Sequence, residues 1–251
     1  MTRHQDRTAV VTGAGSGIGK SVALRLAADG AAVACADIDE ESSERTAGQI
    51  RAAGGEARGF ALDVTSWDSV VHLHADVQAT YGKTDILASI AGVLLREHLD
   101  EHDAESWRRV IDINLTGVYF CAKAFLPGMR ERRWGRIINM GSISGLTGYY
   151  YPSYAASKAG VINLTRNLVL ESNGTGVTAN SVCPGTIDTG MLKREVIPEM
   201  IKKNPVGRLG VPDDVAALVS FLASEEAGFI NGATIVIDGG ATSVFRYFDD
   251  A

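Results

Sequence analysis

The chain of 251 residues is 45% hydrophobic and 22% charged, so it is not a disordered protein and can form one large α/β domain or two small ones. Its 24 basic and 30 acidic residues give a formal net charge of -6 with no basic block, which argues against a nucleic-acid binder or an anionic-membrane binder. We therefore expect small, locally recognised ligands as partners.

Seven short runs of small and β-branched residues alternate with amphipathic stretches, as strands and helices do when they follow one another along a chain. This alternation implies right-handed crossovers and a parallel sheet that is covered on both faces. No Pro- or Ser-rich linker and no repeat of fixed period interrupts it, so the sequence predicts a single doubly wound α/β domain over residues 1–251. The predicted strands are 8–12, 31–36, 57–62, 85–91, 135–141, 176–182 and 233–238.

The first predicted strand runs into the glycine-rich stretch TGAGSGIGK. Its four glycines allow a tight turn into a helix and a close approach to a ligand, while the helix N-terminus offers free N–H groups to a pyrophosphate. The same letters nearly satisfy a P-loop, because Lys20 and Ser21 stand where that motif needs them and Ala14 replaces only its first glycine. A dinucleotide loop and a nucleoside triphosphate loop are both open at this point.

An acidic residue, Asp37, closes the second predicted strand 18 residues beyond Gly19, where a dinucleotide fold places a carboxylate against the adenosine ribose. A carboxylate accepts hydrogen bonds from ribose hydroxyls and repels a 2′-phosphate, and no Arg or Lys follows in DIDEES to compensate. The sequence therefore favours NAD over NADP. Asp63, which closes the third strand, is expected to reach the adenine side.

Tyr154 and Lys158 are four residues apart in SYAASKAG, so a helix places the phenol and the ammonium on one face. A phenol has a pKa of about 10, and lowering it by about 2 to 3 units requires roughly 3 to 4 kcal/mol. An ammonium about 4 Å away supplies energy of that order at an effective dielectric constant of about 20. An ordinary helix surface and a tyrosine that acts as a general base near neutral pH are both open for this pair at this point.

Together with GSISG at 141–145 and INLTG at 113–117, this stretch resembles the short-chain dehydrogenase/reductase family, in its NAD-dependent alcohol dehydrogenase or ketone reductase type. The resemblance runs from TGAGSGIG through PGTIDT at 184–189 to ATIVIDGG near the C-terminus. It implies a Rossmann-like fold and an oxidoreductase of alcohols and ketones. The catalytic residues that it implies are Ser142, Tyr154, Lys158 and Asn114.

In the roles that the resemblance implies, Ser142 donates a hydrogen bond to the substrate oxygen, with Ser144 as the nearby alternative. Asn114 is a water-holding link that passes the proton from Lys158 to solvent, and Lys158 also holds the nicotinamide ribose. The predicted cofactor-binding residues, of which the last two resemble the family's contacts to the carboxamide, are Gly13, Ser16, Gly17, Ile18, Gly19, Asp37, Ile38, Asp63, Val64, Ala91, Gly92, Tyr154, Lys158, Pro184, Gly185, Ile187 and Thr189.

One departure from the family pattern follows the fourth predicted strand, where the family commonly has NNAG and this chain has SIAG at Ser89–Gly92. Two amide side chains that link neighbouring strands and the adenosine side are thereby lost. We expect backbone groups or Ser89 to replace these contacts, at a cost of about 1 kcal/mol for each lost bond.

These patterns predict an enzyme that transfers hydride between NAD and a secondary alcohol or ketone. A reductase of 3-oxoacyl thioesters carried by acyl carrier protein or CoA is the alternative within the family, and Lys193, Arg194, Lys202 and Lys203 leave an anionic or carrier-bound substrate open. The alternatives from other classes are a P-loop phosphohydrolase, which leaves the Tyr and Lys motif unexplained, and a non-catalytic NAD-binding scaffold.

No metal site is predicted, because His98 and His102 have suitable spacing but no third ligand stands nearby. The tyrosines of GYYYPSY at 148–154 either wall a substrate pocket or simply pack. The segment 189–205, with Met191 and Leu192 near its start, is expected to cross the mouth of the site as a lid.

Three cysteines, Cys35, Cys121 and Cys183, stand singly in apolar segments, which suits reduced core thiols better than disulfides. The N-terminus is polar, and no apolar run approaches the roughly 18 residues of a membrane span. We therefore expect a soluble cytoplasmic protein without membrane association. The resemblance also implies a homotetramer or a homodimer, formed mainly through the helices around 104–129 and 153–172.

Overall fold

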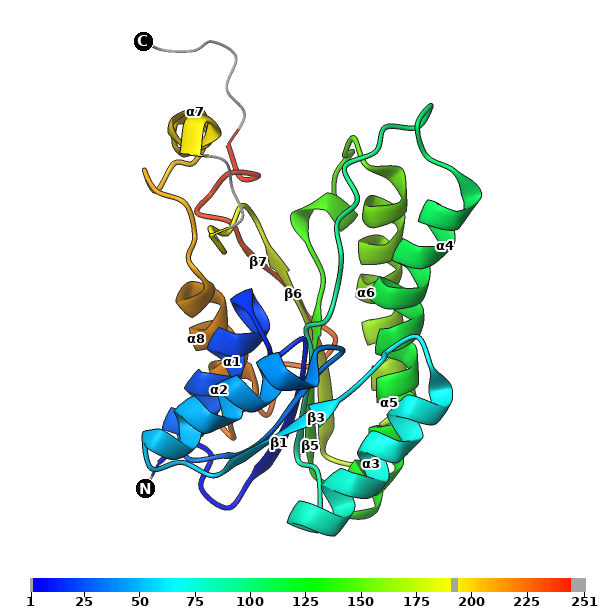
Figure 1. Cartoon of the computed structure of the whole chain (residues 1–251), viewed down its shortest axis with the longest axis vertical. Helices are drawn as coiled ribbons and strands as arrows, with labels where there is room; N and C mark the ends of the chain where they lie inside the picture. The colour runs from blue at the N-terminus through cyan, green and yellow to red at the C-terminus, as the bar shows by residue number, and fades with distance from the viewer. Residues whose placement is uncertain (1, 191–193, 245–251) are drawn as a thin grey trace.

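Seven parallel strands form one sheet at the centre of the molecule, in the order β3-β2-β1-β4-β5-β6-β7 (Figure 1). The computed structural model describes residues 2–190 and 194–244. Each predicted strand is present within a few residues of its expected bounds, so the predicted doubly wound parallel sheet is confirmed. The strands are β1 Thr8–Thr12, β2 Ala32–Asp37, β3 Ala57–Ala61, β4 Ile86–Ser89, β5 Gly135–Met140, β6 Val177–Pro184 and β7 Thr234–Ile237.

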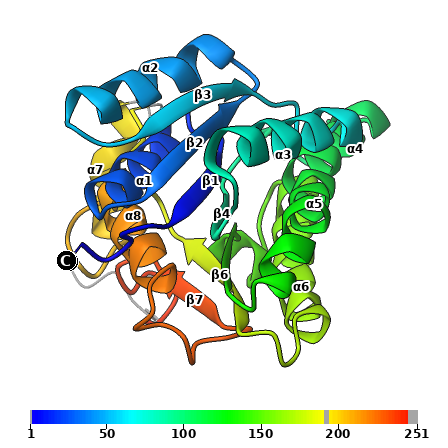
Figure 2. The same ribbon diagram turned by 90° about the horizontal axis from the view of Figure 1, so that it is seen from below.

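Helices cover both faces of this sheet (Figure 2). Neighbouring residues of β1 point to opposite faces, so Val11 packs in the core under α1 and α8, whereas Val10 packs in the core under α3 and α5. The strands are apolar on both sides for this reason. One face carries α1 Gly17–Ala28, α2 Glu40–Ala52 and α8 Pro212–Leu222, and the other carries α3 Trp67–Tyr81, α5 Gly117–Glu131 and α6 Pro152–Glu171; α4 Ala104–Ile111 and α7 Ile197–Lys202 are shorter.

The order of the strands reverses between β1 and β4, and this reversal positions the site. The chain crosses from β1 to β2 on one side, while β4 pairs with β1 on the other, so the connections after β1 and β4 diverge. Thr12 holds the floor of the resulting crevice, because its hydroxyl accepts hydrogen bonds from the backbone N–H groups of Ile90 (3.0 Å) and Ala91 (3.1 Å). Ligands of such sheets bind at this switch point.

The helix expected over 104–129 is interrupted by a π-helix at Asp112–Thr116, which the sequence did not predict. Gly117 N–H donates to the carbonyl of Asp112, five residues back. The π-helix packs closely against α6 at Gly160. A Cβ atom added to Gly160 would lie only 2.7 Å from Leu115 Cδ2 in the π-helix. The extra residue in the π-turn changes the direction in which side chains after it point around the helix axis. Asn114, within the π-helix, is fully buried.

Through this π-helix the chain is helical over 28 residues, Ala104–Glu131, and the run is long and apolar enough to cross a membrane by length and composition alone. The sequence-based expectation that no run approaches this length was therefore wrong. An 18-residue window has a mean hydropathy of 1.2, and 44% of it is buried inside the protein. Core helices of soluble proteins meet the same criterion, so the run is weak evidence for a membrane span.

A buried histidine joins the N-terminal segment to two helices at the opposite edge of the sheet from the crevice. His4 Nε2 lies 3.0 Å from Ser220 Oγ on α8, and Ser220 donates a hydrogen bond to Asp29 at the end of α1. His4 N–H donates to the Asp29 carbonyl at 2.7 Å. Burial is the largest cause that lowers the pKa of His4, from 6.5 to about 4.

Because this pKa is lower in the folded protein, the unfolded chain takes up the proton more readily as pH falls. The stability that neutral His4 contributes is fully present above pH 6.5 and is lost as pH falls from 6.5 towards about 4. We expect this loss to reach about 3 kcal/mol. The His4→Gln variant, which cannot titrate, should show a flatter dependence of unfolding free energy on pH in urea titrations. Equal slopes in the two proteins would contradict this origin.

Candidate active site

The glycine-rich turn forms a cradle between β1 and α1. Gly13 has φ +69° and packs so closely that a Cβ there would lie 2.9 Å from Ala91 Cα. A Cβ on Gly19 would overlap the carbonyl oxygen of Gly13. Ser16 is the N-cap of α1 but makes no side-chain capping bond, so its hydroxyl and the N–H groups of the first turn are free for a ligand. These features fit the pyrophosphate of a dinucleotide.

The P-loop alternative fails on geometry. Ser21, which would hold magnesium in that motif, is buried and donates a hydrogen bond to Asp213 on α8. Neither Lys20 nor Ser21 lines the cavity beside the turn. The side chains that a triphosphate site requires therefore do not face the ligand space.

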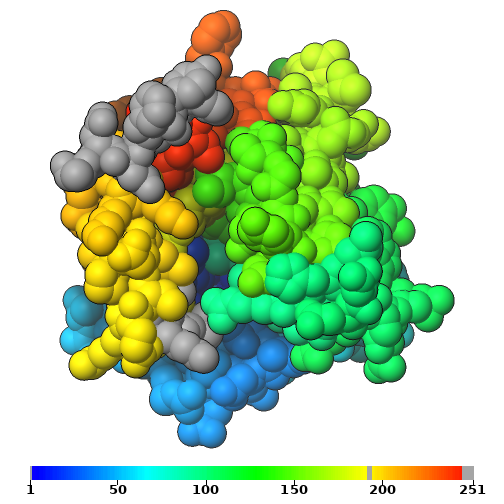
Figure 3. Space-filling view, turned by 90° about the horizontal axis from the view of Figure 1, so that it is seen from above, coloured from blue at the N-terminus to red at the C-terminus, as the bar shows by residue number. Residues whose placement is uncertain are grey.

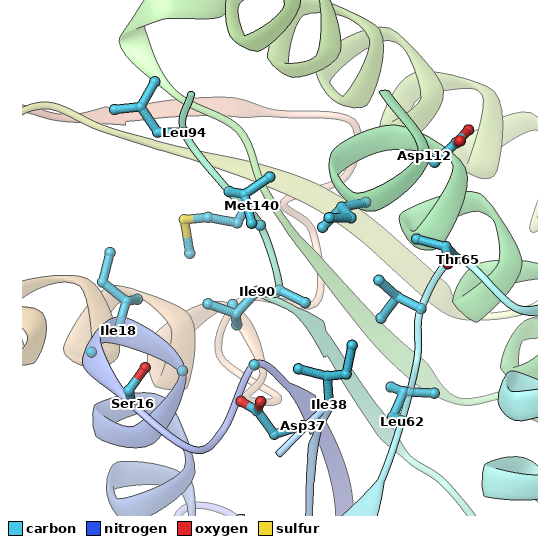
Figure 4. Close-up of a pocket in the computed structure, with 18 of the residues that line it drawn as sticks. Ser16, Ile18, Asp37, Ile38, Leu62, Thr65, Ile90, Leu94, Asp112 and Met140 are labelled. Carbon is cyan, nitrogen blue, oxygen red and sulfur yellow. The ribbon is translucent and has the colours of Figure 1, made fainter. Parts of the chain in front are cut away.

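Carboxylates line the rim of the cavity at the ends of β2 and β3. Asp37 accepts hydrogen bonds from Gly15 N–H (2.9 Å) and Asp39 N–H (3.2 Å), which fix its carboxylate beside the glycine turn (Figure 4). Asp63 accepts from both the N–H and the hydroxyl of Thr65. Among the described residues, no basic side chain forms an ion pair with Asp37. The rim is therefore negative where an adenosine ribose would bind.

A cavity of about 780 Å³ connects this rim to the helix that carries Tyr154 and Lys158. Of the predicted cofactor-binding residues, it is lined by Gly13, Ser16, Gly17, Ile18, Gly19, Asp37, Ile38, Asp63, Val64, Ala91, Gly92, Tyr154, Lys158 and Thr189. The remaining three do not line it. Pro184 ends β6, Gly185 packs against Asp238, and Ile187 forms a β-bridge with Gly210 beside a second cavity of about 360 Å³.

Several lining residues were not predicted. Most of them lie within two residues of a predicted position, and this closeness in sequence was the only sign that they would line the cavity. Three others lie on or beside the π-helix, where the rotation of the helix decides which side chains face the cavity, and the sequence gives no signal for that rotation. The residues are Leu62, Thr65, Ile90, Val93, Leu94 and Met140 in the first group, and Arg109, Asp112 and Ile113 in the second.

Lys158 lies beside the Tyr154 ring on α6, as predicted. Its Nζ atom is 5.7 Å from the ring centroid and donates a hydrogen bond to the carbonyl oxygen of Met140 at 2.8 Å. The amine is 3% exposed, and burial lowers the pKa of Lys158 to about 8. The lysine is therefore mostly charged at neutral pH and loses its charge above about pH 8.

The pKa of Tyr154 differs from the prediction. Burial raises it above its ordinary value, a hydrogen bond with Ser142 lowers it, and nearby Tyr149 raises it further. The sequence-based expectation of a lowered pKa was therefore wrong for the protein alone. The reason is that spacing reveals the neighbouring charge but not the burial of the phenol, which destabilises the phenolate.

Ser142 is brought to the phenol by a short 3₁₀ turn, Ile143–Gly145, that follows β5. Its hydroxyl accepts a hydrogen bond from Ser144 N–H (3.1 Å) and hydrogen-bonds with Tyr154. The turn packs directly on α6, since a Cβ on Gly145 would lie 2.7 Å from Ala159 N. Of the two predicted candidates, Ser142 is thus the serine that reaches the phenol.

Asn114 connects the segment after β4 to α6. Its Oδ1 accepts from Val93 N–H (2.8 Å), and its Nδ2 donates to the Val93 carbonyl (2.9 Å) and to Ser157 Oγ (3.2 Å). Both amide hydrogens are therefore engaged within the protein. Gly92 lets the amide and the lysine approach the same point, because a Cβ there would lie 3.2 Å from Asn114 Oδ1 and 3.5 Å from Lys158 Nζ.

The SIAG departure leaves two buried polar atoms without partners among the described residues. Ser89 Oγ and Asn139 Oδ1 have no hydrogen bond, although their residues are paired across β4 and β5. Ser89 therefore does not replace the missing amide contacts, contrary to one of the two expectations. The backbone N–H groups of Ile90 and Ala91 bind the Thr12 hydroxyl, and the replacement of the amide contacts by backbone groups stays a prediction.

The histidines that the sequence analysis set aside contact other side chains. His98 packs edge-on against aromatic rings, and His102 Nδ1 lies 2.9 Å from Glu97. Within residues 2–190 and 194–244, no group of three or more His, Cys, Asp or Glu could hold a metal ion. Thr189 of the expected lid lines the cavity, whereas Met191, Leu192 and Lys193 lie outside the described residues.

Comparison with known proteins relates this site to a set of oxidoreductases. A family model described as enoyl-(acyl carrier protein) reductase matches residues 13–242. The chain is 42% identical over 244 residues to cis-4-hydroxycyclohexanecarboxylate dehydrogenase of Sinomonas cyclohexanicum, covering 95% of this chain and 98% of that protein. It is 37% identical over 252 residues to 2-(S)-hydroxypropyl-CoM dehydrogenase 3 of Xanthobacter autotrophicus, covering 96% and 99%.

The structure is also similar to solved structures. A short-chain type dehydrogenase/reductase from Mycobacterium marinum superposes with a TM-score of 0.92 at 33% identity, covering 96% of this chain and 97% of that one. The fold is therefore one that many solved structures share.

Two substitutions at the floor of the crevice should have very different effects. Thr12→Val removes the acceptor of one buried and one half-buried backbone N–H group, so we expect it to lower the unfolding free energy by about 2 kcal/mol. Ser89→Ala removes a hydroxyl that has no partner, so its effect should stay within about 0.5 kcal/mol of zero. Urea unfolding measures both, and a cost for Ser89→Ala equal to that of Thr12→Val would show that Ser89 has a partner.

Proposed function

The chain belongs to the short-chain dehydrogenase/reductase family, and on that premise we propose that it transfers hydride between NAD and a secondary alcohol or the corresponding ketone. One observation carries the proposal. Tyr154 and Lys158 line the same cavity as the glycine cradle and Asp37, and Ser142 hydrogen-bonds with Tyr154 beside it. A dinucleotide in this cavity would have its reactive ring beside the phenol.

A nicotinamide ring bound there supplies the carbon that accepts or gives hydride. The protein's own residues handle the proton and the oxygen. Ser142 donates a hydrogen bond to the substrate oxygen, Tyr154 takes the hydroxyl proton during oxidation and returns it during reduction, and Lys158 supplies the positive charge that favours the phenolate. Asn114 positions Val93 and α6 around that charge.

Burial alone makes Tyr154 a proton donor, which suits ketone reduction. Alcohol oxidation needs the phenolate, and positive charge must then outweigh the cost of burial. Lys158 carries such a charge below about pH 8, and a cationic oxidised cofactor acts in the same direction. The direction of the reaction is therefore expected to depend on pH, with reduction favoured at lower pH.

The cofactor preference is proposed from the acidic rim. Asp37 accepts hydrogen bonds and has no cationic partner among the described residues, so it would repel the 2′-phosphate of NADP. Asp63 adds a second carboxylate to the same cavity. Arg109 is the one guanidinium among its lining residues, and it belongs to α4 rather than to the segment that follows Asp37.

Substrate class is proposed from the relatives. Two of them are named for the oxidation of a secondary hydroxyl on a small molecule, one of which is a carboxylate. The description of the matching family model keeps a carrier-bound thioester as the alternative, together with the exposed Arg194 and Lys203 near the mouth. Asp37 favours a small secondary alcohol as substrate, because thioester reductases of this family generally use NADPH and Asp37 would repel its 2′-phosphate.

Assembly and compartment are also proposals. Exposed apolar side chains on the helices around the π-helix and on α6 support a homotetramer or a homodimer, since Trp107 is 41% exposed, Tyr119 45% and Leu170 75%. The three cysteines are free and buried, which suits a reducing cytoplasm.

The proposed function is tested by following NADH formation from a panel of secondary alcohols with NAD or NADP. We expect turnover with NAD, a clear preference over NADP, and a loss of at least about a hundredfold in kcat in Tyr154→Phe. Binding of NAD, measured by thermal shift, should persist in that variant.

Tyr150→Phe is the matched control, because Tyr150 is 77% exposed and its ring contacts His98 rather than Tyr154. Its turnover of neutral alcohols should stay close to that of the unaltered protein. If NAD binds but no alcohol or ketone reacts in any of the proteins, the chain is the non-catalytic scaffold instead.

A further inference from the structure

Ring contacts connect Tyr154 to the segment 93–98. The ring of Tyr149 lies 6.2 Å from that of Tyr154 and 5.2 Å from that of Tyr151. Tyr151 in turn contacts the His98 ring edge-on at 5.6 Å. His98 belongs to the segment 93–98, which begins at the cavity wall with Val93. The path from the phenol to this segment is therefore continuous.

This segment forms one side of a hollow that opens to solvent. Seen from above, the hollow lies between the parts of the chain near residues 93–98, 143–155 and 194–210 (Figure 3). Leu94 points into the cavity (Figure 4), and Arg96 is two residues further along the same segment. A substrate held at Tyr154 would extend towards this side.

Arg96 is an exposed cation without a protein partner. Among the described residues, no ion pair or hydrogen bond of its side chain is formed. Neither nearby glutamate forms an ion pair with Arg96, because Glu97 Oε2 lies 2.9 Å from His102 Nδ1 and Glu101 accepts a hydrogen bond from His98 N–H at 3.1 Å. The positive charge of Arg96 lowers the pKa of Tyr149, against the effect of burial, so the guanidinium acts on this ring.

We propose that Arg96 and the Tyr149 hydroxyl form an anion-binding subsite, so that the preferred substrate is a secondary alcohol or ketone that carries a carboxylate. This inference rests on the proposed function and names the substrate class of the same site. The Tyr149 and Tyr154 rings are neighbours, with centroids 6.2 Å apart, so one small substrate can reach both side chains.

The charge of the protein makes a dedicated cation necessary for such a substrate. The chain has a formal net charge of -6, and Asp37 and Asp63 line the cavity. The electrostatic potential around the site is therefore negative and opposes the approach of an anion. A guanidinium and a phenol together offer several donors to one carboxylate, and Arg binds planar anions in a bidentate way. Neutral alcohols gain nothing from this arrangement.

Matched substrates separate the charge from the shape. The NAD-dependent oxidation of 4-hydroxycyclohexanecarboxylate is compared with that of its methyl ester, and we expect kcat/KM to be about tenfold or more higher for the acid, which corresponds to about 1.4 kcal/mol. In Arg96→Gln this advantage should disappear, mainly through a higher KM for the acid. The ester should react as before, and Tyr149→Phe should lose a smaller part of the advantage.

Arg130→Gln is the matched control, since it removes an exposed arginine near the C-terminal end of α5, the end that leads into the start of β5. It should leave the ratio of acid to ester unchanged. The subsite is refuted if the unaltered protein oxidises the ester as well as the acid, or if Arg96→Gln lowers both to the same extent. Absence of turnover with every alcohol and ketone is a different result, because it overturns the proposed function itself and the subsite with it.

Discussion

The burial of an amine beside a buried phenol is the interaction on which the rest of this site depends. Lys158 donates a hydrogen bond to the Met140 carbonyl at 2.8 Å, which offsets part of the cost of burying its charge, and the Ser142 hydroxyl hydrogen-bonds with Tyr154. Met140 ends β5, and Ser142 begins the turn that follows it. One strand end therefore holds both members of the pair on α6, and the geometry of the pair is fixed by the sheet rather than by a mobile loop.

Close backbone contacts provide that geometry. Gly145 lets the turn after β5 rest on α6, Gly92 lets the segment after β4 approach Lys158, and Gly160 lets α6 approach Leu115. A methyl group at Gly145 or Gly160 would lie 2.7 Å from a neighbouring atom, and one at Gly92 would lie 3.2 Å from Asn114 Oδ1, so these approaches leave little room for a side chain. The π-helix belongs to the same arrangement, because it lies at the contact with Gly160 and buries Asn114 where its amide holds Val93. The same residues are thus needed for close packing and for the positions of the site side chains.

Much of the fold was predictable from the sequence because it depends on local periodicity. The seven strands, the glycine turn and the position of Asp37 at the end of β2 follow from short patterns and from the rules for parallel sheets. What could not be predicted depends on distant contacts. The π-helix packs against Gly160 more than forty residues away, and Arg109, which precedes it on α4, lines the cavity. The direction of the pKa shift of Tyr154 required the burial of the ring, and the missing partner of Ser89 required the packing around Asn139.

The most direct measurement of the central claim is the titration of Tyr154 itself in the NAD-bound protein. Carbon-13 labelling of the tyrosine ring reports ionisation, and comparison with Tyr154→Phe assigns the signal. The pair of charges predicts a pKa for Tyr154 below the value of about 10 of a free phenol, and a rise well above it in Lys158→Met. A pKa that stays above 10 with NAD bound, or that does not change when Lys158 is replaced, would contradict the claim that the buried amine controls the phenol.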